Sequence, residues 1–369
     1  MLKAELAVVG AGPAGLACAI EAARAGVHTV VVDENDRPGG QLFKQIHKFF
    51  GSAEHWAGRR GFEIGEELLA EASRLGIRVL LRHAAVGLRL GEEGGFELWV
   101  WDQARGLLGR LSADRVAIAT GASENALAFP GWTLPGVMGA GAVQTLLNVH
   151  RVLPGRRVLM VGSGNVGLIV SCQLLQAGVR AVTVVESAAA VGGYEVHAAK
   201  IRRYGVPILL RTTVRRAWGD GRTKGVTLVR LDDNGSPIPG SEEDLAVDLV
   251  CVATGLSPLA ELAWLAGCKF TYSPILGGFV PVHGPDMQTS VRGVYVAGDA
   301  SGVEEASVAL EEGRLAGVSV AMSLGRTDLE RGQRAQAEIA RRLEDLRRGP
   351  FGEKRQHAKQ WIHDQVVGA

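Results

Sequence analysis

A short glycine-rich turn occurs twice in this sequence, each time between an apolar run and a helix-like stretch. In the first copy, Gly10 to Gly15 follows the apolar run 6–9 and opens the Ala-rich stretch 13–25. A second apolar run, 29–32, comes directly afterwards. Continuous apolar strands joined by a helix predict a βαβ unit in a parallel sheet that is covered on both faces.

The second copy lies about 150 residues further along the chain. Gly162 to Gly167 follows the apolar run 157–161 and opens the helix-like stretch 166–177. The run 181–185 then completes the pattern. We therefore expect an α/β fold that contains one type of nucleotide-binding unit twice.

Length and composition agree with a two-domain globular protein. A chain of 369 residues exceeds what one hydrophobic core usually serves. The net charge of +1 provides no basic field that would attract nucleic acid or an anionic membrane. No apolar run reaches the roughly 18 residues that a membrane span needs, and the N-terminus lacks a signal-peptide pattern. We therefore expect a cytoplasmic location.

The first turn has the features of a dinucleotide site. Its glycines permit a tight turn, close approach of a pyrophosphate to the backbone, and close packing of helix on strand. The helix N-terminus faces the negative charge of the pyrophosphate. The alternative is a glycine-rich turn that binds no ligand. The predicted binding residues are Gly10, Gly12, Pro13, Ala14 and Gly15, with the acidic pair Asp33 and Glu34 placed to bind ribose hydroxyls.

The second turn predicts a nicotinamide dinucleotide. Glu186, at the end of the following strand, can accept hydrogen bonds from the adenine ribose hydroxyls and would repel a 2′-phosphate. No arginine lies immediately beside it. The sequence therefore favours NAD(H) over NADP(H). The predicted residues are Gly162, Gly164, Asn165, Val166, Gly167 and Glu186.

Further short motifs accompany these two turns in the sequence. They are Pro38 to Gln41, the Thr-Gly pairs at 120–121 and 254–255, and Gly298-Asp299 at the end of a late apolar run. Across roughly residues 1–325 this set resembles the glutathione- and thioredoxin-reductase-like flavoproteins. The resemblance implies FAD at the first turn and NAD(H) at the second. It adds Gly40, Gln41, Thr120, Gly121, Gly298 and Asp299 to the FAD site, and Thr254 and Gly255 to the NAD site.

Asp299 has two interpretations at this stage. By the resemblance, it hydrogen-bonds the ribityl or pyrophosphate region of FAD, and the helix expected over 304–324 points its N-terminus at the flavin. The alternative is an aspartate that only caps that helix.

The resemblance also implies two Rossmann-like, glutathione-reductase-type domains, with the NAD domain inserted in the FAD domain. The expected FAD domain comprises residues 1–125 and 257–326, and the expected NAD domain comprises 126–256. We expect no C-terminal dimerisation domain. The remaining segment, 327–369, is charged and helical in pattern, with a break at Gly349-Pro350, and is interpreted as an appendage.

The cysteines depart from the disulfide reductases of this class. There are four, Cys18, Cys172, Cys251 and Cys268, and none belongs to a CxxC pair. Thioredoxin reductases carry such a pair just before the second nucleotide strand, where this chain has the segment 135–142 without cysteine. A single thiol cannot form the internal disulfide that passes two electrons, so we expect no dithiol relay. We expect the four cysteines to serve as small, buried apolar residues.

A narrower resemblance rests on the segment 129–137 and on Pro38 to Gln41. Both are similar to the FAD/NAD-type subunit of amine-oxidising complexes: heterotetrameric sarcosine oxidase (its alpha subunit), opine oxidase, hydrogen cyanide synthase and hydroxyproline dehydrogenase. In those families a second flavoprotein subunit oxidises the amine. The sequence contains no Cys-rich iron–sulfur segment, and we expect no aminomethyltransferase-like domain. Any iron–sulfur relay would therefore belong to another polypeptide.

Acid–base candidates are few. Lys44 could stabilise a reduced flavin by its charge, and His47 could lie near the flavin, although a surface or packing histidine is the commoner case. No cluster of Cys and His has the spacing of a metal site. Hydride transfer between cofactors needs no protein base, so the shortage of candidates does not argue against an enzyme.

The sequence thus predicts a flavin- and NAD(H)-dependent oxidoreductase, not a disulfide reductase, that serves as one subunit of an amino acid or amine dehydrogenase. A second flavoprotein and possible iron–sulfur protein are the expected partners. Two alternatives stay open: a stand-alone NADH:acceptor reductase, and a non-catalytic subunit with structural nucleotide sites.

Overall fold

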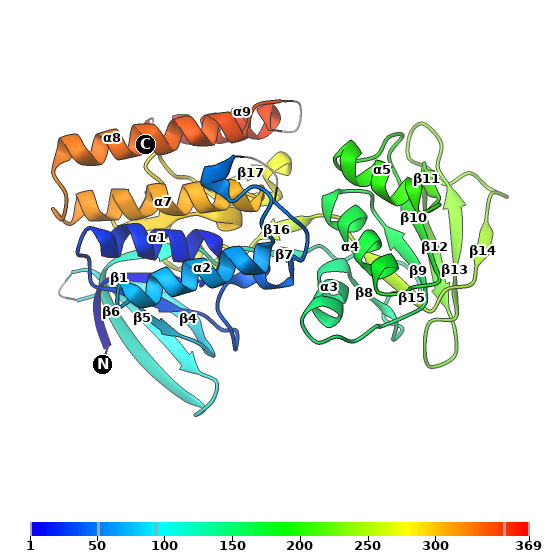
Figure 1. The fold of residues 1–369 in the computed structure, drawn as a ribbon, viewed down its shortest axis with the longest axis horizontal. Coiled ribbons are helices and arrows are strands. Elements are labelled where there is room, and N and C mark those ends of the chain that lie inside the picture. The colour runs from blue at the N-terminus through cyan, green and yellow to red at the C-terminus, as the bar shows by residue number, and fades with distance from the viewer. Residues whose placement is uncertain (1, 50–51, 93, 350–351, 368–369) are drawn as a thin grey trace. The chain divides into compact units, whose positions relative to one another are not determined.

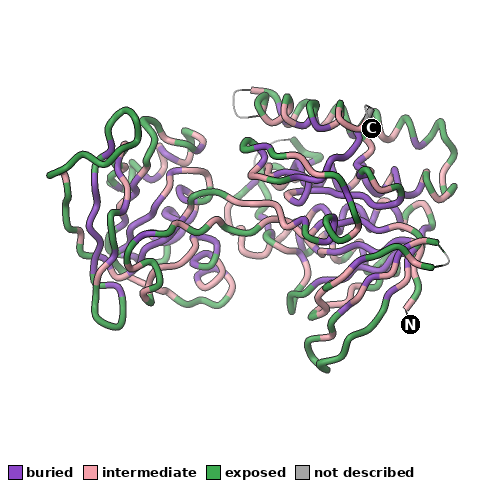
Figure 2. Tube along the Cα trace, turned by 180° about the vertical axis from the view of Figure 1, so that it is seen from behind, coloured by how far each residue is buried: buried purple, intermediate pink, exposed green. Residues whose placement is uncertain are grey.

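A computed structural model describes residues 2–49, 52–92, 94–349 and 352–367 of the chain (Figure 1). The chain divides into two compact units. The first unit comprises Met1–Ser123 and Ser257–Ala369, and the inserted unit comprises Glu124–Leu256. Figure 2 shows that buried residues gather in the interior of each unit.

The first unit contains a seven-stranded mixed sheet. Four strands run parallel to β1, directly or through a neighbour, and two form an antiparallel meander on β6. The strands are β1 (Leu2–Val9), β2 (Thr29–Val32), β3 (Arg78–Leu80), β4 (His83–Leu90), β5 (Phe96–Asp102), β6 (Leu107–Ile118) and β19 (Val294–Val296).

Both faces of this sheet are covered around its parallel strand β1, as the apolar strand pattern predicts. In β1, Leu6 and Val8 belong to one buried cluster, and Ala7 and Val9 belong to another. Strand β6 is long, because no glycine or proline interrupts residues 110–118. This single strand therefore bridges the meander and β1.

Three helices, α1 (Pro13–Arg24), α2 (Gly61–Arg74) and α7 (Ala306–Ser323), lie on one side of the sheet (Figure 1). Helices α1 and α7 pack so closely that glycines of α7 lie against the backbone of α1. A Cβ atom on Gly313 would overlap the carbonyl oxygen of Ala14, and one on Gly317 would overlap that of Cys18. The crossing therefore requires glycine at positions 313 and 317.

Shorter elements complete the first unit. They are the 3₁₀ turns η1 (Gly40–Lys44), η2 (Ala53–His55), η3 (Pro274–Leu276) and η4 (Gly298–Ser301), helix α6 (Glu261–Leu265), and the hairpin strands β17 (Phe270–Ser273) and β18 (Gly278–Pro281). Two short connecting strands, β7 (Ala122–Glu124) and β16 (Leu256–Pro258), pair where the chain passes from one unit to the other.

The inserted unit repeats the strand–turn–helix pattern. Its five-stranded sheet is parallel and has the order β11-β10-β9-β15-β8. The elements are β8 (Val137–Gly139), α3 (Ala140–Asn148), β9 (Arg157–Val161), α4 (Asn165–Gln176), β10 (Ala181–Glu186), α5 (Glu195–Arg203), β11 (Ile208–Leu210) and β15 (Leu249–Val252). A separate antiparallel sheet contains β12 (Thr212–Trp218), β13 (Gly225–Arg230) and β14 (Glu243–Leu245).

The C-terminal segment is an integral part of the first unit, in contrast to the appendage that its composition suggests. Helix α8 (Leu329–Leu346) places Ile339 and Leu343 in the core shared with α1 and α7. Helix α9 (Glu353–Val367) buries Ile362 against η3 and β18. Gly349 lies between the helices, as expected, while Pro350 lies outside the described residues. No helix of the described segments is both long and apolar enough to cross a bilayer.

Candidate functional site

The two glycine-rich turns have the same backbone construction. The amide of Gly10 donates to the carbonyl of Val32 over 2.8 Å, and the amide of Gly162 donates to that of Val185 over 2.8 Å. Each turn is thereby fixed to the strand that follows the helix. The two sites can be compared residue by residue.

The first and third glycines of each turn are required by the fold. Gly10 has a φ of +104°, and a Cβ atom on it would overlap the carbonyl oxygen of Ala119. A Cβ atom on Gly15 would overlap the carbonyl oxygen of Gly10. Gly162, with a φ of +103°, and Gly167 repeat both features. These four positions exclude any side chain on steric grounds alone.

The second glycines are different, because nothing in the fold requires them. Gly12 has a φ of −78°, and the nearest atom to a Cβ there would be the Cα of Gly40 at 3.9 Å. Gly164 has a φ of −66°, and a Cβ there would meet no atom within 4 Å. Both residues lie at helix N-caps without a side-chain cap. Each turn therefore has open space at a helix N-terminus, where a pyrophosphate can approach the backbone.

A glycine pair closes over each turn. The amide of Gly39 donates to the carbonyl of Ala11 over 2.7 Å, and the amide of Gly193 donates to that of Ser163 over 2.9 Å. The sequence predicted the first pair but missed Gly192-Gly193. A comparison of the two repeats would have found it, because each pair begins six residues after the strand-end carboxylate.

The carboxylates at the ends of β2 and β10 hold the glycine-rich turns by hydrogen bonds. Asp33 is buried, and its Oδ2 accepts from the amide of Ala11 over 2.6 Å. Glu186 Oε2 accepts from the amide of Ser163 over 2.9 Å and from its Oγ over 2.6 Å. Burial raises the pKa of Glu186, but hydrogen bonds from Ala188 and Ser163 outweigh it and hold the pKa below its usual value. Glu34, the second residue of the predicted acidic pair, is exposed.

The Gly298-Asp299 turn lies against the first glycine-rich turn. Gly298 has a φ of +67°, and a Cβ there would lie 2.8 Å from the Cβ of Ala14 in α1. Asp299 does not cap α7, because the N-cap is Glu305 and Asp299 Oδ1 accepts from the amide of Glu304 over 3.2 Å. Burial, reinforced by the charge of Glu312, raises the pKa of Asp299 to about 7.

Thr120 and Thr254 have equivalent places. Each follows the alanine whose carbonyl lies beneath the first glycine of its turn. The hydroxyl of Thr120 donates to the carbonyl of Leu259, and the hydroxyl of Thr254 donates to that of Asn125 over 3.2 Å. Each Thr-Gly pair thus joins the outgoing and returning chain beside a glycine-rich turn.

The remaining predicted residues are more scattered. Pro13 and Ala14 open α1, and Asn165 opens α4, where its Oδ1 accepts from the amide of Tyr194 over 2.8 Å. Gln41 in η1 and Val166 in α4 are exposed.

Lys44 and His47 are half-buried around the end of η1, and the His47 ring stacks on Phe49 at 5.9 Å. All four cysteines are free and buried. Burial raises the pKa of Cys18 to about 12 and raises that of Cys251 as well. No group of at least three His, Cys, Asp or Glu in the described part of the chain could hold a metal ion.

Curated relatives are similar to this chain over most of its length. An opine oxidase subunit of Agrobacterium tumefaciens (strain Ach5) is 29% identical over 87% of this chain and 66% of its own length. Hydrogen cyanide synthase subunit HcnB of Pseudomonas aeruginosa is 30% identical over 85% and 70%. The alpha subunit of sarcosine oxidase from Rhizobium meliloti (strain 1021) is 31% identical over 87% and 31%. The chain thus spans about two thirds or less of the first and third of these relatives.

Among solved structures, thioredoxin reductase of T. acidophilum superposes with a TM-score of 0.73 at 22% identity, over 88% of this chain and 99% of that one. This likeness confirms an α/β fold of the thioredoxin-reductase-like type. The pyridine nucleotide-disulphide oxidoreductase family matches residues 4–313, which include both glycine-rich turns and the Gly298-Asp299 turn. The chain therefore belongs to the pyridine nucleotide-disulphide oxidoreductase family.

Proposed function

We propose that this protein is an oxidoreductase that binds FAD at the first glycine-rich turn and NAD(H) at the second. The observation that carries the proposal is the pair Gly12 and Gly164. Both positions tolerate a side chain in backbone conformation and in space, yet both are glycine. A ligand that approaches the backbone explains both glycines together, and the family match makes dinucleotides the natural ligands.

When bound, FAD and NAD(H) supply the hydride chemistry, and the protein supplies binding and orientation. Asp33 and Glu186 hold the turns from below through the amides of Ala11 and Ser163. The N-termini of α1 and α4 face the open space above Gly12 and Gly164, which favours a negatively charged group there. We assign Asp299, which lies beside the first turn, to FAD binding.

The second site is assigned to NAD(H). Glu186 is ionised at neutral pH, because its pKa lies below the usual value. The four residues that follow it, Ser187 and three alanines, are uncharged. A negative charge at this position repels the extra phosphate of NADP(H).

Anaerobic titration of the purified protein tests this assignment. NADH should bleach the flavin absorbance near one equivalent, because both cofactors are bound by the same chain. NADPH should need at least about tenfold more nucleotide, a difference of about 1.4 kcal/mol in binding. Equal reduction by the two nucleotides would contradict the role of Glu186. Bound FAD that NADH leaves oxidised would favour the non-catalytic alternative.

We further propose that the protein serves as one subunit of an amine or amino acid dehydrogenase of the sarcosine, opine or hydroxyproline type. Its relatives are named as subunits of opine oxidase, hydrogen cyanide synthase and sarcosine oxidase. Its four thiols are buried and unpaired, so they offer no dithiol route for electrons. Electrons then need an external partner, for which a second flavoprotein, with or without an iron–sulfur protein, is the expected class.

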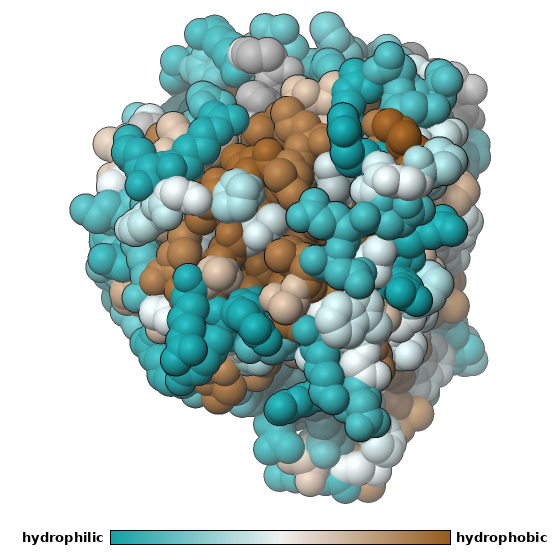
Figure 3. Space-filling model, turned by 90° about the vertical axis from the view of Figure 1, so that its right-hand side faces the viewer, coloured by the Kyte–Doolittle hydropathy of each residue, from teal (hydrophilic) through white to brown (hydrophobic). Residues whose placement is uncertain are grey.

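The surface has features that suit such a partner. Apolar side chains form a patch within a polar surround on the face shown in Figure 3. The rings of Trp264, Tyr272 and Phe279 in the first unit are also exposed. Contiguous exposed apolar surface of this kind commonly marks a protein interface.

Turnover measurements separate a complex-dependent enzyme from a stand-alone reductase. The chain alone should be reduced by NADH yet should turn over slowly with quinones or ferredoxin-like proteins. Co-expression with a second flavoprotein of the amine-oxidising class should yield a stable complex that oxidises an amine and raises turnover at least about tenfold. Full steady-state turnover of the isolated chain with one natural acceptor would instead support the stand-alone NADH:acceptor reductase.

A further inference from the structure

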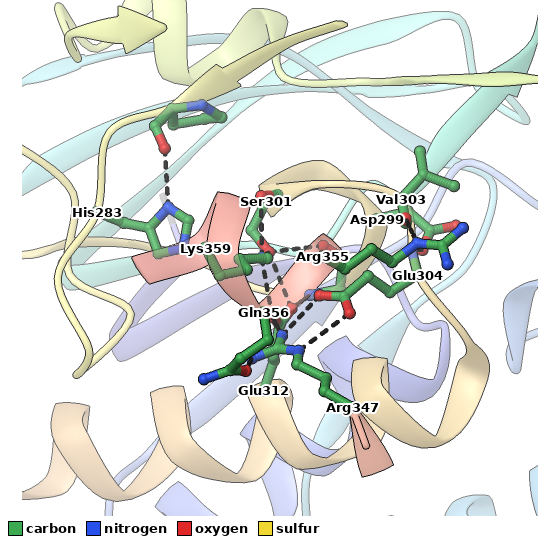
Figure 4. Close-up of polar contacts among 12 residues, drawn as sticks. His283, Asp299, Ser301, Val303, Glu304, Glu312, Arg347, Arg355, Gln356 and Lys359 are labelled. Carbon is green, nitrogen blue, oxygen red and sulfur yellow. Dashed lines mark hydrogen bonds and ion pairs between the residues drawn. The ribbon is translucent and has the colours of Figure 1, made fainter. Parts of the chain in front are cut away.

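The Gly298–Ser301 turn rests on a cluster of buried charged side chains (Figure 4). At its centre is Glu312 of α7, which is only 2% exposed. Its Oε2 accepts from the amide of Gly298 over 3.0 Å and from the hydroxyl of Ser301 over 2.8 Å. One carboxylate thus holds both ends of the turn that contains Asp299.

Lys359 of α9 reaches the same turn from the C-terminal helices and is 1% exposed. Its ammonium group lies 2.8 Å from Oε1 of Glu312. It also donates to the carbonyl of Ser301 over 3.0 Å and to the Ser301 hydroxyl over 2.7 Å. These three interactions use all three donors of a lysine, so the charge is buried with every hydrogen bond made.

Arg347, at the end of α8, provides the second buried cation. It forms a bidentate pair with Glu304, at 2.6 and 3.0 Å, and contacts Glu312 at 2.7 Å. The cluster therefore contains two carboxylates and two cations, with Asp299 beside it. The cations follow residue 313, where the family match ends, and so belong to helices outside that match.

We propose that Lys359 is a positioning residue of the FAD site, which acts by cancelling the charge of Glu312 beneath the Gly298–Ser301 turn. Glu312 holds the turn against α1, but its negative charge alone would oppose an anionic dinucleotide at the adjacent glycine-rich turn. Lys359 removes this conflict, since it neutralises Glu312 without taking its hydrogen bonds to Gly298 and Ser301. Helix α9 thereby becomes part of the flavin-binding apparatus. The inference rests on the proposed binding of FAD at the first turn.

The test compares the FAD dissociation constants of four variants with that of the wild type, measured by flavin fluorescence after removal of bound FAD. Lys359→Met leaves Glu312 only Arg347, which Glu304 shares, and should raise the constant at least about tenfold, or about 1.4 kcal/mol. Glu312→Gln combined with Lys359→Met removes both charges and should return the constant to within about threefold of wild type. Lys354→Met, an exposed lysine on the same helix, is the matched control and should bind FAD normally.

The double variant distinguishes charge cancellation from simple support of the fold, because a purely structural lysine is not replaced by removing Glu312 as well. Equal loss of FAD binding in the single and double variants would overturn the proposal. So would a Lys359→Met protein that melts earlier but binds FAD like the wild type.

If Lys359→Met does not fold, Glu312→Gln decides. Charge cancellation predicts FAD affinity at or above that of the wild type, and a tenfold loss would refute it. A wild-type protein that binds no FAD would refute the proposed function itself. If the wild type binds FAD but the charge-changing variants bind it equally well, only the role of Lys359 is refuted.

Discussion

Replacement of Gly12 by valine should yield a folded protein that has lost FAD, whereas Gly164→Val should yield a yellow protein that NADH no longer reduces. Each new side chain occupies the open space at a helix N-terminus where the proposed pyrophosphate approaches. We expect each dissociation constant to rise at least about a hundredfold, or about 2.8 kcal/mol. Isothermal titration with FAD and with NADH measures both effects, and the melting temperature of the apo protein should change little.

The two variants serve as controls for each other, because each should leave the other nucleotide in place. Gly109→Val, at an exposed position of β6 where a Cβ would meet only the carbonyl of Val100 at 3.7 Å, should affect neither nucleotide. Gly15→Ala should fail to fold, because its Cβ would overlap the backbone of Gly10. Normal binding of both dinucleotides by Gly12→Val and Gly164→Val would remove the main support for the proposed sites.

Much of the fold around these turns is predictable because it depends on local interactions. An apolar run, a glycine that needs a positive φ, and an Ala-rich stretch specify β1, the turn and α1 without reference to the rest of the chain. The same holds for β9, α4 and β10. Placement of Gly298 against Ala14 could be expected only from the family resemblance, because nearly 300 residues separate the two positions.

The C-terminal helices show where local reasoning fails. Their many charged residues favour a solvated surface helix pair, and α8 does expose most of its charges. Arg347 and Lys359 are nevertheless buried, because Glu304 and Glu312 of a distant segment meet them. A charged residue is buried in the core only where a partner of opposite charge meets it. No periodicity in the segment 327–369 indicates which residue that partner is.

Asp299→Asn should stabilise the fold of the apo protein but weaken FAD binding. In the folded protein, burial and then the neighbouring glutamates raise the pKa of Asp299 from 3.8 to about 7. The unfolded chain ionises Asp299 near 3.8, so its contribution to stability is fully present below that pH and is lost as the pH rises to about 7. Asparagine cannot ionise and still offers an oxygen to the amide of Glu304. The variant should therefore be more stable than wild type by about 2–4 kcal/mol at pH 8, with the gain shrinking toward pH 4.5.

Denaturant unfolding of the apo proteins between pH 4.5 and 8.5 measures this difference. More acidic conditions are avoided because the pKa of Glu312, which burial alone would raise but Lys359 and Arg347 lower to about 2, makes stability fall as the pH drops from 4.5 toward 2. Asp220→Asn, at an exposed position in the inserted unit, should show no pH-dependent gain. Parallel stability curves for wild type and Asp299→Asn would show that the carboxyl group is well solvated.

The same variant should bind FAD at least about tenfold more weakly, because an amide replaces a carboxylate that we assign to the ligand. A residue that weakens the empty protein at neutral pH and strengthens ligand binding is retained for the ligand rather than for the fold. Ligand hydroxyl groups that donate to Asp299 would favour its ionised form and lower its pKa, so FAD should stabilise the wild type more strongly at pH 8 than at pH 5. If Asp299→Asn binds FAD like the wild type at both pH values, Asp299 does not contact the flavin nucleotide, and its assignment to FAD binding is wrong.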